Sequence, residues 1–93
     1  MNSISIEELK KYTNYKLIDI RDKESYMKGH LKGAVNVEIE DILAFPNKYL
    51  SKNLTYVFYC DEGKSSLKLV QTLKKNYDVL SLNEGYNKLK GMR

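Results

Sequence analysis

The 93-residue chain has the length of one domain with a single hydrophobic core. Its content of 42% hydrophobic and 30% charged residues excludes fibrous and disordered classes. The 16 lysines and arginines behind the net charge of +4 never occur more than two in a row, which favours a solvated surface over a nucleic-acid-binding one. We therefore expect one domain over residues 1–93, with no nucleic-acid partner.

Sequence signals for export or membrane insertion are missing. Residues 1–11 contain glutamates and no apolar run of signal-peptide length. The longest apolar stretch, residues 56–60, is far shorter than the roughly 20 residues that span a bilayer. A single cysteine, Cys60, cannot form an internal disulfide, as is typical of proteins in reducing compartments. These features predict a cytoplasmic protein without a membrane partner.

The first predicted element is a short helix with a capping box. Ser5 is placed to cap its start, and Glu8 stands three residues later to complete the box. Ile4 is expected to pack on Leu9 as a hydrophobic staple. The helix should run to about residue 12.

Two strands and a helical turn are predicted next. Residues 17–20 form a compact run rich in β-branched side chains, which indicates a buried parallel strand. Asp22 can cap a short helix that Gly29 ends in the left-handed conformation. Residues 30–37 then read as a turn into a second strand.

The middle of the chain predicts a broken helix and then the strongest strand. Helical spacing over residues 38–44 is interrupted by Pro46, and residues 47–50 suit another turn of helix. Residues 54–59 follow as a strand that ends directly at Cys60.

The last third contains a polar loop, a helix, a strand and a terminal helix. From residue 66 onward, Leu67, Val70 and Leu73 recur at three-residue spacing and indicate an amphipathic helix. A strand at 79–82 and a short helix at 86–90 close the chain. The alternation of strands and helices predicts an α/β fold with a central parallel sheet and helices on both faces.

Cys60 is the candidate catalytic residue. In parallel sheets ligands bind beyond the carboxyl ends of strands, where Cys60 stands. Gly63 allows a tight turn, after which the free amides of a helix start would face the sulfur and stabilise an anion. Lys64 would favour the thiolate, whereas Asp61 and its neighbouring glutamate would oppose it. Free cysteines are often simple core residues, but this strand, loop and helix arrangement favours function.

Other chemically active side chains favour structural roles. His30 follows a glycine at a turn and is interpreted as a hydrogen-bonded structural histidine. Asp19 and Arg21 flank a strand end and are expected to pair with each other. One cysteine and one histidine at unrelated positions supply no metal-ligand cluster, so no metal is expected.

Five segments, in order and over nearly the whole chain, resemble the rhodanese family. They are Ile4-Ser5 with Glu8-Leu9, Asp19-x-Arg21, Gly29-His30-Leu31-x-Gly33-Ala34, Tyr59-Cys60-x-x-Gly63-x-x-Ser66 and Leu82-x-Glu84-Gly85-Tyr86. Each is a weak signal alone, and five in order are a strong one. The resemblance implies a three-layer α/β fold with a central parallel sheet between two layers of helices.

The resemblance also implies a sulfurtransferase or sulfur carrier. Cys60 would take sulfane sulfur as a persulfide from a small donor, such as thiosulfate, or from a protein persulfide, and pass it to a thiol or cyanide-like acceptor without a cofactor. The loop after it would bind the substrate through its backbone. Its residues are Asp61, Glu62, Gly63, Lys64, Ser65 and Ser66.

Departures from the family pattern bear on the donor. Many active single-domain members have arginine where Ser65 stands, and a charged hydrogen bond is worth about 1.5–3 kcal/mol. Asp61 and Glu62 further disfavour a dianion, so we expect weak thiosulfate activity. The tryptophan usual near the C-terminus is absent, as is one of the two closing glycines, since Glu84 stands there.

Other functions compete with sulfur transfer. A phosphatase or arsenate reductase with a related loop would need arginine at Ser66, and a thioredoxin-type exchanger would need cysteine at Gly63. The alternative left open is a catalytically weak rhodanese-like module for binding or sensing. The acidic loop supports that alternative, whereas the retained thiol argues against it.

Overall fold

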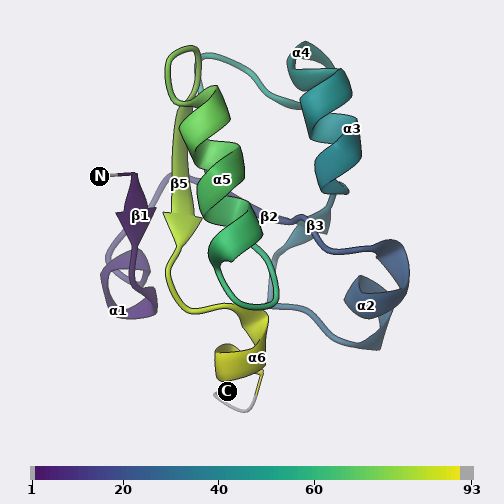
Figure 1. The fold of residues 1–93 in the computed structure, drawn as a ribbon. Coiled ribbons are helices and arrows are strands. Elements are labelled where there is room, and N and C mark those ends of the chain that lie inside the picture. The colour runs from purple at the N-terminus through teal and green to yellow at the C-terminus, as the bar shows by residue number, and fades with distance from the viewer. Residues whose placement is uncertain (1, 91–93) are drawn as a thin grey trace.

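The computed structural model describes residues 2–90, which form one parallel sheet with helices around it. The strands follow the order β1-β5-β4-β2-β3, and Figure 1 shows the edge strands β1 and β3 on opposite sides of the sheet. They are β1 Ser3–Ile4, β2 Lys16–Asp19, β3 Val35–Asn36, β4 Thr55–Tyr59 and β5 Asp78–Leu82. The helices are α1 Ile6–Leu9, α2 Lys23–Lys28, α3 Ile39–Ala44, α4 Pro46–Tyr49, α5 Lys64–Leu73 and α6 Tyr86–Leu89.

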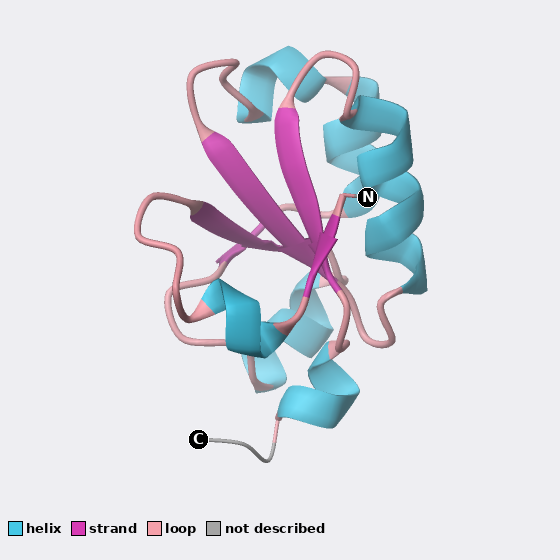
Figure 2. Ribbon diagram, turned by 90° about the vertical axis from the view of Figure 1, so that its left-hand side faces the viewer, coloured by secondary structure: helices cyan, strands magenta, loops and turns pink. Residues whose placement is uncertain are grey.

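Strand β4 lies at the centre of the sheet and is buried on both faces. Phe58 and Tyr59 are both fully buried but belong to different cores, because successive strand side chains point to opposite faces. Side chains of α3, α4 and α5 pack on the Phe58 face, and those of α1, α2 and α6 on the Tyr59 face. Figure 2 shows the twisted strands with helices packed around them. The predicted three-layer α/β fold is confirmed.

The N-terminal segment forms the predicted capping box and an unpredicted strand. Ser5 caps α1, and both hydrogen bonds with Glu8 are present. Ile4 and Leu9 are buried in the same core, as the staple requires. Ile4 also belongs to β1, where it pairs with Leu82 at the edge of the sheet. Helix α1 ends at Leu9, earlier than predicted, and turns follow it.

Two predictions about helix ends are wrong. Gly29 follows α2 with φ 164°, which is extended backbone and not the left-handed conformation. Helix α5 begins at Lys64, two residues before the predicted start, because Gly63 adopts the left-handed conformation with φ +93° and turns the chain into the helix early. The predicted cap of α2 is confirmed, since the side chain of Asp22 accepts a hydrogen bond from the backbone N–H of Ser25. None of the helices within residues 2–90 combines the length and apolarity needed to span a bilayer.

Candidate active site

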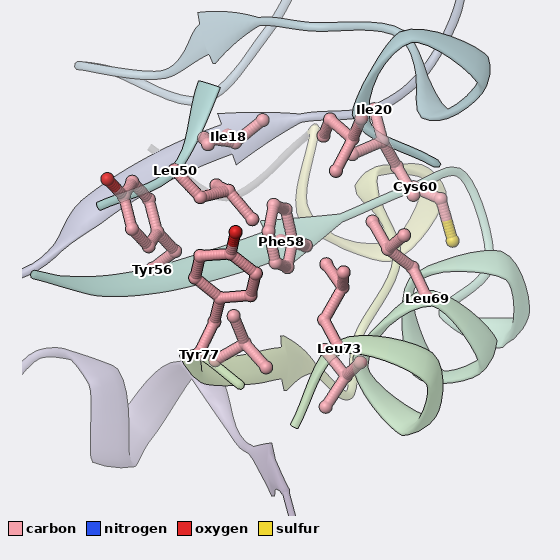
Figure 3. Close-up of a cluster of buried hydrophobic side chains, with 12 residues drawn as sticks. Ile18, Ile20, Leu50, Tyr56, Phe58, Cys60, Leu69, Leu73 and Tyr77 are labelled. Atoms are coloured by element: carbon pink, nitrogen blue, oxygen red, sulfur yellow. The ribbon is translucent and has the colours of Figure 1, made fainter. Parts of the chain in front are cut away.

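Cys60 directly follows β4, where the central strand leaves the sheet. The residue is 7% exposed and belongs to the core on the Phe58 face of the sheet. Figure 3 places it at the edge of that cluster, with the sulfur atom turned away from Phe58. Cys60 therefore has an apolar base and a sulfur atom that faces a polar loop.

Two backbone amides donate to this sulfur. The N–H of Gly63 lies 3.1 Å from Sγ of Cys60, and the N–H of Ser66 lies 3.4 Å from it. Both amides belong to the turn that opens α5, where N–H groups lack partners within the helix. Because α5 begins at Lys64, these amides come within hydrogen-bonding distance of the sulfur. Two of the amides expected to face the sulfur therefore converge on it.

Gly63 is required at its position for two reasons. Its left-handed backbone is a conformation that L side chains rarely adopt. A β-carbon there would also come within 2.6 Å of the carbonyl oxygen of Asn83, which belongs to the segment after β5. The glycine therefore permits both the turn and the close approach of two chain segments.

Ser66 is fully buried, and its hydroxyl contacts the sheet, the loop and the cysteine. Its hydroxyl lies 2.8 Å from that of Ser81 on β5, and the Cys60 thiol donates to it across 3.5 Å. The hydroxyl also donates to the carbonyl oxygen of Gly63. These contacts anchor the first turn of α5 to the sheet.

Cys60 lines a crevice of about 430 Å³. Four of the predicted substrate-binding residues line it, namely Asp61, Glu62, Lys64 and Ser65. Gly63 and Ser66 do not line the crevice, although their amides contact the sulfur. Sequence reasoning placed Arg21 at this strand end, but only as the structural partner of Asp19, and it did not assign to the site the other residues of the wall, which are Ile20, Asp22, Ser25, Ile39 and Asn87. Ile20 and Asp22 could have been found from the carboxyl end of β2, which pairs with β4.

Arg21 is fixed beside the crevice by contacts from three directions. It forms a two-pronged ion pair with buried Asp19, donates to the carbonyl oxygen of Gly29 at 2.6 Å and lies over the ring of Tyr86. The predicted pairing with Asp19 is confirmed. Burial alone would lower the pKa of Arg21, but the hydrogen bonds and the charge of Asp19 outweigh it and raise the pKa. The guanidinium is therefore a permanent cation at the site.

Residues 5–92 match the rhodanese-like domain family. The chain belongs to this family. Since the match covers nearly the whole chain, the resemblance carried by the five motifs is confirmed.

Individual relatives are consistent with this assignment. The chain is 48% identical over 59 residues to a tRNA sulfurtransferase of Pyrobaculum aerophilum, and this stretch spans 63% of the chain but only 12% of that protein. The crystal structure of a rhodanese-like domain protein from Staphylococcus aureus is similar with a TM-score of 0.80 at 25% identity, covering 94% of this chain and 89% of the other. A human single-domain sulfurtransferase shares the fold with a TM-score of 0.83 at 21% identity, over 100% and 98% of the two chains.

The departure at Glu84 has a structural role in this rhodanese-like domain. Its side chain accepts a hydrogen bond of 3.0 Å from the backbone N–H of Ile6, at the start of α1. A glycine could not make this contact. Glu84 therefore joins the closing segment of the chain to the first helix.

His30 has the structural role predicted for it. Its Nδ1 lies 2.9 Å from the carbonyl oxygen of Tyr26, and its ring stacks on the Tyr26 ring with 3.8 Å between centroids. His30 does not line the crevice that contains Cys60. Within the rhodanese-like site, the cysteine is thus surrounded by backbone amides, hydroxyls and charged side chains without a histidine base.

Proposed function

We propose that this rhodanese-like domain is a sulfurtransferase that carries sulfane sulfur on Cys60 as a persulfide. The observation that supports it is the pair of amides, from Gly63 and Ser66, that donate to the cysteine sulfur. Hydrogen bonds to an ionised group are stronger than those to a neutral one, so these two donors are placed to stabilise negative charge on the sulfur during transfer. The thiolate is the nucleophilic form of cysteine.

The reaction proceeds as two displacements at sulfur. The Cys60 thiolate attacks the outer sulfur of the donor, and the donor's S–S bond breaks with its electron pair leaving on sulfite or on a thiolate. The product is a persulfide anion on Cys60, whose terminal sulfur lies in the crevice. An acceptor thiolate or cyanide then attacks that terminal sulfur, and the Cys60 thiolate leaves with the electron pair of the broken bond.

The walls of the crevice bear on the choice of donor. Ser65 replaces the arginine found in many active relatives, and Asp61 and Glu62 place two carboxylates in the crevice wall. We therefore propose weak activity with thiosulfate, a compact dianion, and better loading from a polysulfide or a protein persulfide. A single free thiol suits this chemistry to a reducing compartment such as the cytoplasm.

Intact mass spectrometry tests the proposal directly, because the chain has one cysteine. The reduced protein is exposed to polysulfide and, separately, to thiosulfate, and Cys60→Ser serves as the control. We expect the mass of one added sulfur atom, greater occupancy with polysulfide, and loss of that mass on adding cyanide or a thiol.

Failure of both donors to load the folded protein would contradict the carrier function. Circular dichroism establishes that the protein tested is folded. The alternative of a rhodanese-like binding or sensing module would then be the function to pursue. Equal loading from both donors would support the carrier function and contradict the donor preference.

A further inference from the structure

The guanidinium of Arg21 is immobilised on all but one of its edges. Its Nε and one terminal nitrogen are occupied by Asp19 and by the carbonyl oxygen of Gly29. Its plane lies over the ring of Tyr86, 4.2 Å from the ring centre. The other terminal nitrogen, Nη1, faces Asp61 in the wall of the crevice that Cys60 also lines. A fixed cation thus presents one donor edge in the crevice that contains Cys60.

The contact at that edge is a long ion pair with an exposed carboxylate. Nη1 of Arg21 lies 3.4 Å from a carboxylate oxygen of Asp61, whose side chain is 54% exposed, whereas that of Arg21 is 7% exposed. The pair is weak because it is long and water competes for the Asp61 carboxylate. The Asp19 pair differs, since it is 2.7 Å long and its carboxylate is fully buried. An anion from solution could therefore replace Asp61 at Nη1 without disturbing the other contacts of Arg21.

We propose that Arg21 is the anion-recognition residue of the crevice and that Asp61 is a built-in competitor for its free edge. This inference rests on the proposed sulfur transfer only in naming the anion, which would be a negatively charged sulfur donor. Asp61 occupies the position that the anionic end of such a donor would take. Arg21, two residues beyond the end of β2, therefore supplies the cation that the active loop lacks at Ser65, and Asp61 sets which anions reach it.

The test compares two alkylating reagents that differ in charge, and it does not depend on sulfur transfer. Iodoacetate is an anion and iodoacetamide is neutral, and each alkylates Cys60, the single cysteine. The ratio of their rates removes the effect of thiol ionisation, because both react with the same thiolate. Asp61→Asn should raise the ratio of iodoacetate to iodoacetamide rates about three- to tenfold, as expected for removing a charge at close range.

Glu62→Gln is the matched control, because it removes the same charge from the same crevice wall. Within residues 2–90, Glu62 makes no ion pair with Arg21, so its ratio should rise markedly less. A second arm adds Asp61→Asn to an Arg21→Lys protein, in which the gain should shrink. If that protein does not fold by circular dichroism, the comparison with Glu62→Gln decides alone.

Equal rises for Asp61→Asn and Glu62→Gln, or no rise for either, would overturn the inference. The outcome is separable from that of the sulfur-transfer proposal. If the ratio rises as expected but no donor loads Cys60, recognition of anions stands and sulfur transfer fails. If polysulfide loads Cys60 but the ratio does not change, sulfur transfer stands and Arg21 has no role in selecting the donor.

Discussion

Gly85 lies against the backbone of Asp61 so closely that no other residue fits. A β-carbon at Gly85 would overlap the carbonyl group of Asp61 and the α-carbon of Glu62. The two residues after Gly85 donate their amides to the active loop, from Tyr86 to the carbonyl oxygen of Cys60 at 2.8 Å and from Asn87 to that of Asp61 at 3.1 Å. The start of α6 therefore holds the loop in the shape that brings its amides to the sulfur.

Gly85→Ala should distort the active loop. We expect a loss of stability of about 1–3 kcal/mol from overpacking and a clear drop in the rate at which iodoacetamide alkylates Cys60 at neutral pH. Gly33→Ala is the control, because Gly33 has φ +85° but no atom within 4 Å of an added β-carbon. That change should cost about 1–2 kcal/mol in backbone strain and leave the alkylation rate unchanged. A similar drop in both variants would show that general destabilisation, not the contact with the loop, lowers reactivity.

Ser66→Ala should destabilise the protein because it leaves another buried hydroxyl without a hydrogen-bond partner. The buried Ser81 hydroxyl loses its partner, and an unpaired buried polar group costs about 1–3 kcal/mol. Urea unfolding followed by circular dichroism measures the loss. Ser65→Ala, at the exposed neighbouring position, should change the free energy of unfolding by no more than about 0.5 kcal/mol. Adding Ser81→Ala to Ser66→Ala should recover part of the stability, and no recovery would contradict this reason.

Asp19→Ala should be among the most damaging single changes in the chain. It leaves the guanidinium of Arg21, itself 7% exposed, without its main partner, and breaking a buried pair in this way costs about 3–5 kcal/mol. Thermal and urea unfolding measure the effect. Asp22→Ala removes a carboxylate of the same type from the cap of α2, where it is exposed, and should cost much less. Equal losses in the two variants would argue against a dominant buried pair.

Alkaline pH should destabilise the fold through Tyr59. Burial raises the pKa of its phenol well above the ordinary value, and this outweighs the opposing hydrogen bond from the N–H of Leu31. Up to about pH 10 the phenol is protonated in both states, and its contribution to stability is fully present. Above that pH the unfolded chain releases the proton while the folded chain retains it, so stability falls as pH rises toward the folded pKa.

Urea unfolding at several pH values between about 9 and 11 measures this dependence. Tyr59→Phe should weaken the fall in stability above pH 10, although it also leaves the N–H of Leu31 without its partner. Tyr12→Phe, which changes a 44% exposed ring, should keep the wild-type dependence. An unchanged slope in Tyr59→Phe would assign the alkaline effect to other groups.

Local patterns in the sequence were sufficient for much of the fold. The β-rich run that ends at Cys60 predicted the central strand, because a strand buried on both faces needs consecutive apolar residues. The capping box at Ser5 and Glu8 is a contact between residues three apart, so a short stretch of sequence contains all of it. The catalytic candidate followed from its place after that strand.

Contacts between distant segments were decided by the tertiary structure alone. Strand β1 forms because Ile4 pairs with Leu82 at the edge of the sheet. A strand of two residues is too short for its sequence pattern to predict it. The requirement for glycine at Gly85 and the approach of Arg21 to Asp61 depend on which loops pack together at the carboxyl edge of the sheet. The sequence by itself thus determined most of the elements, the position of Cys60 and the nearby loop that faces its sulfur. Only the folded chain decided which residues complete the crevice around Cys60, because residues far apart along the chain meet there through packing.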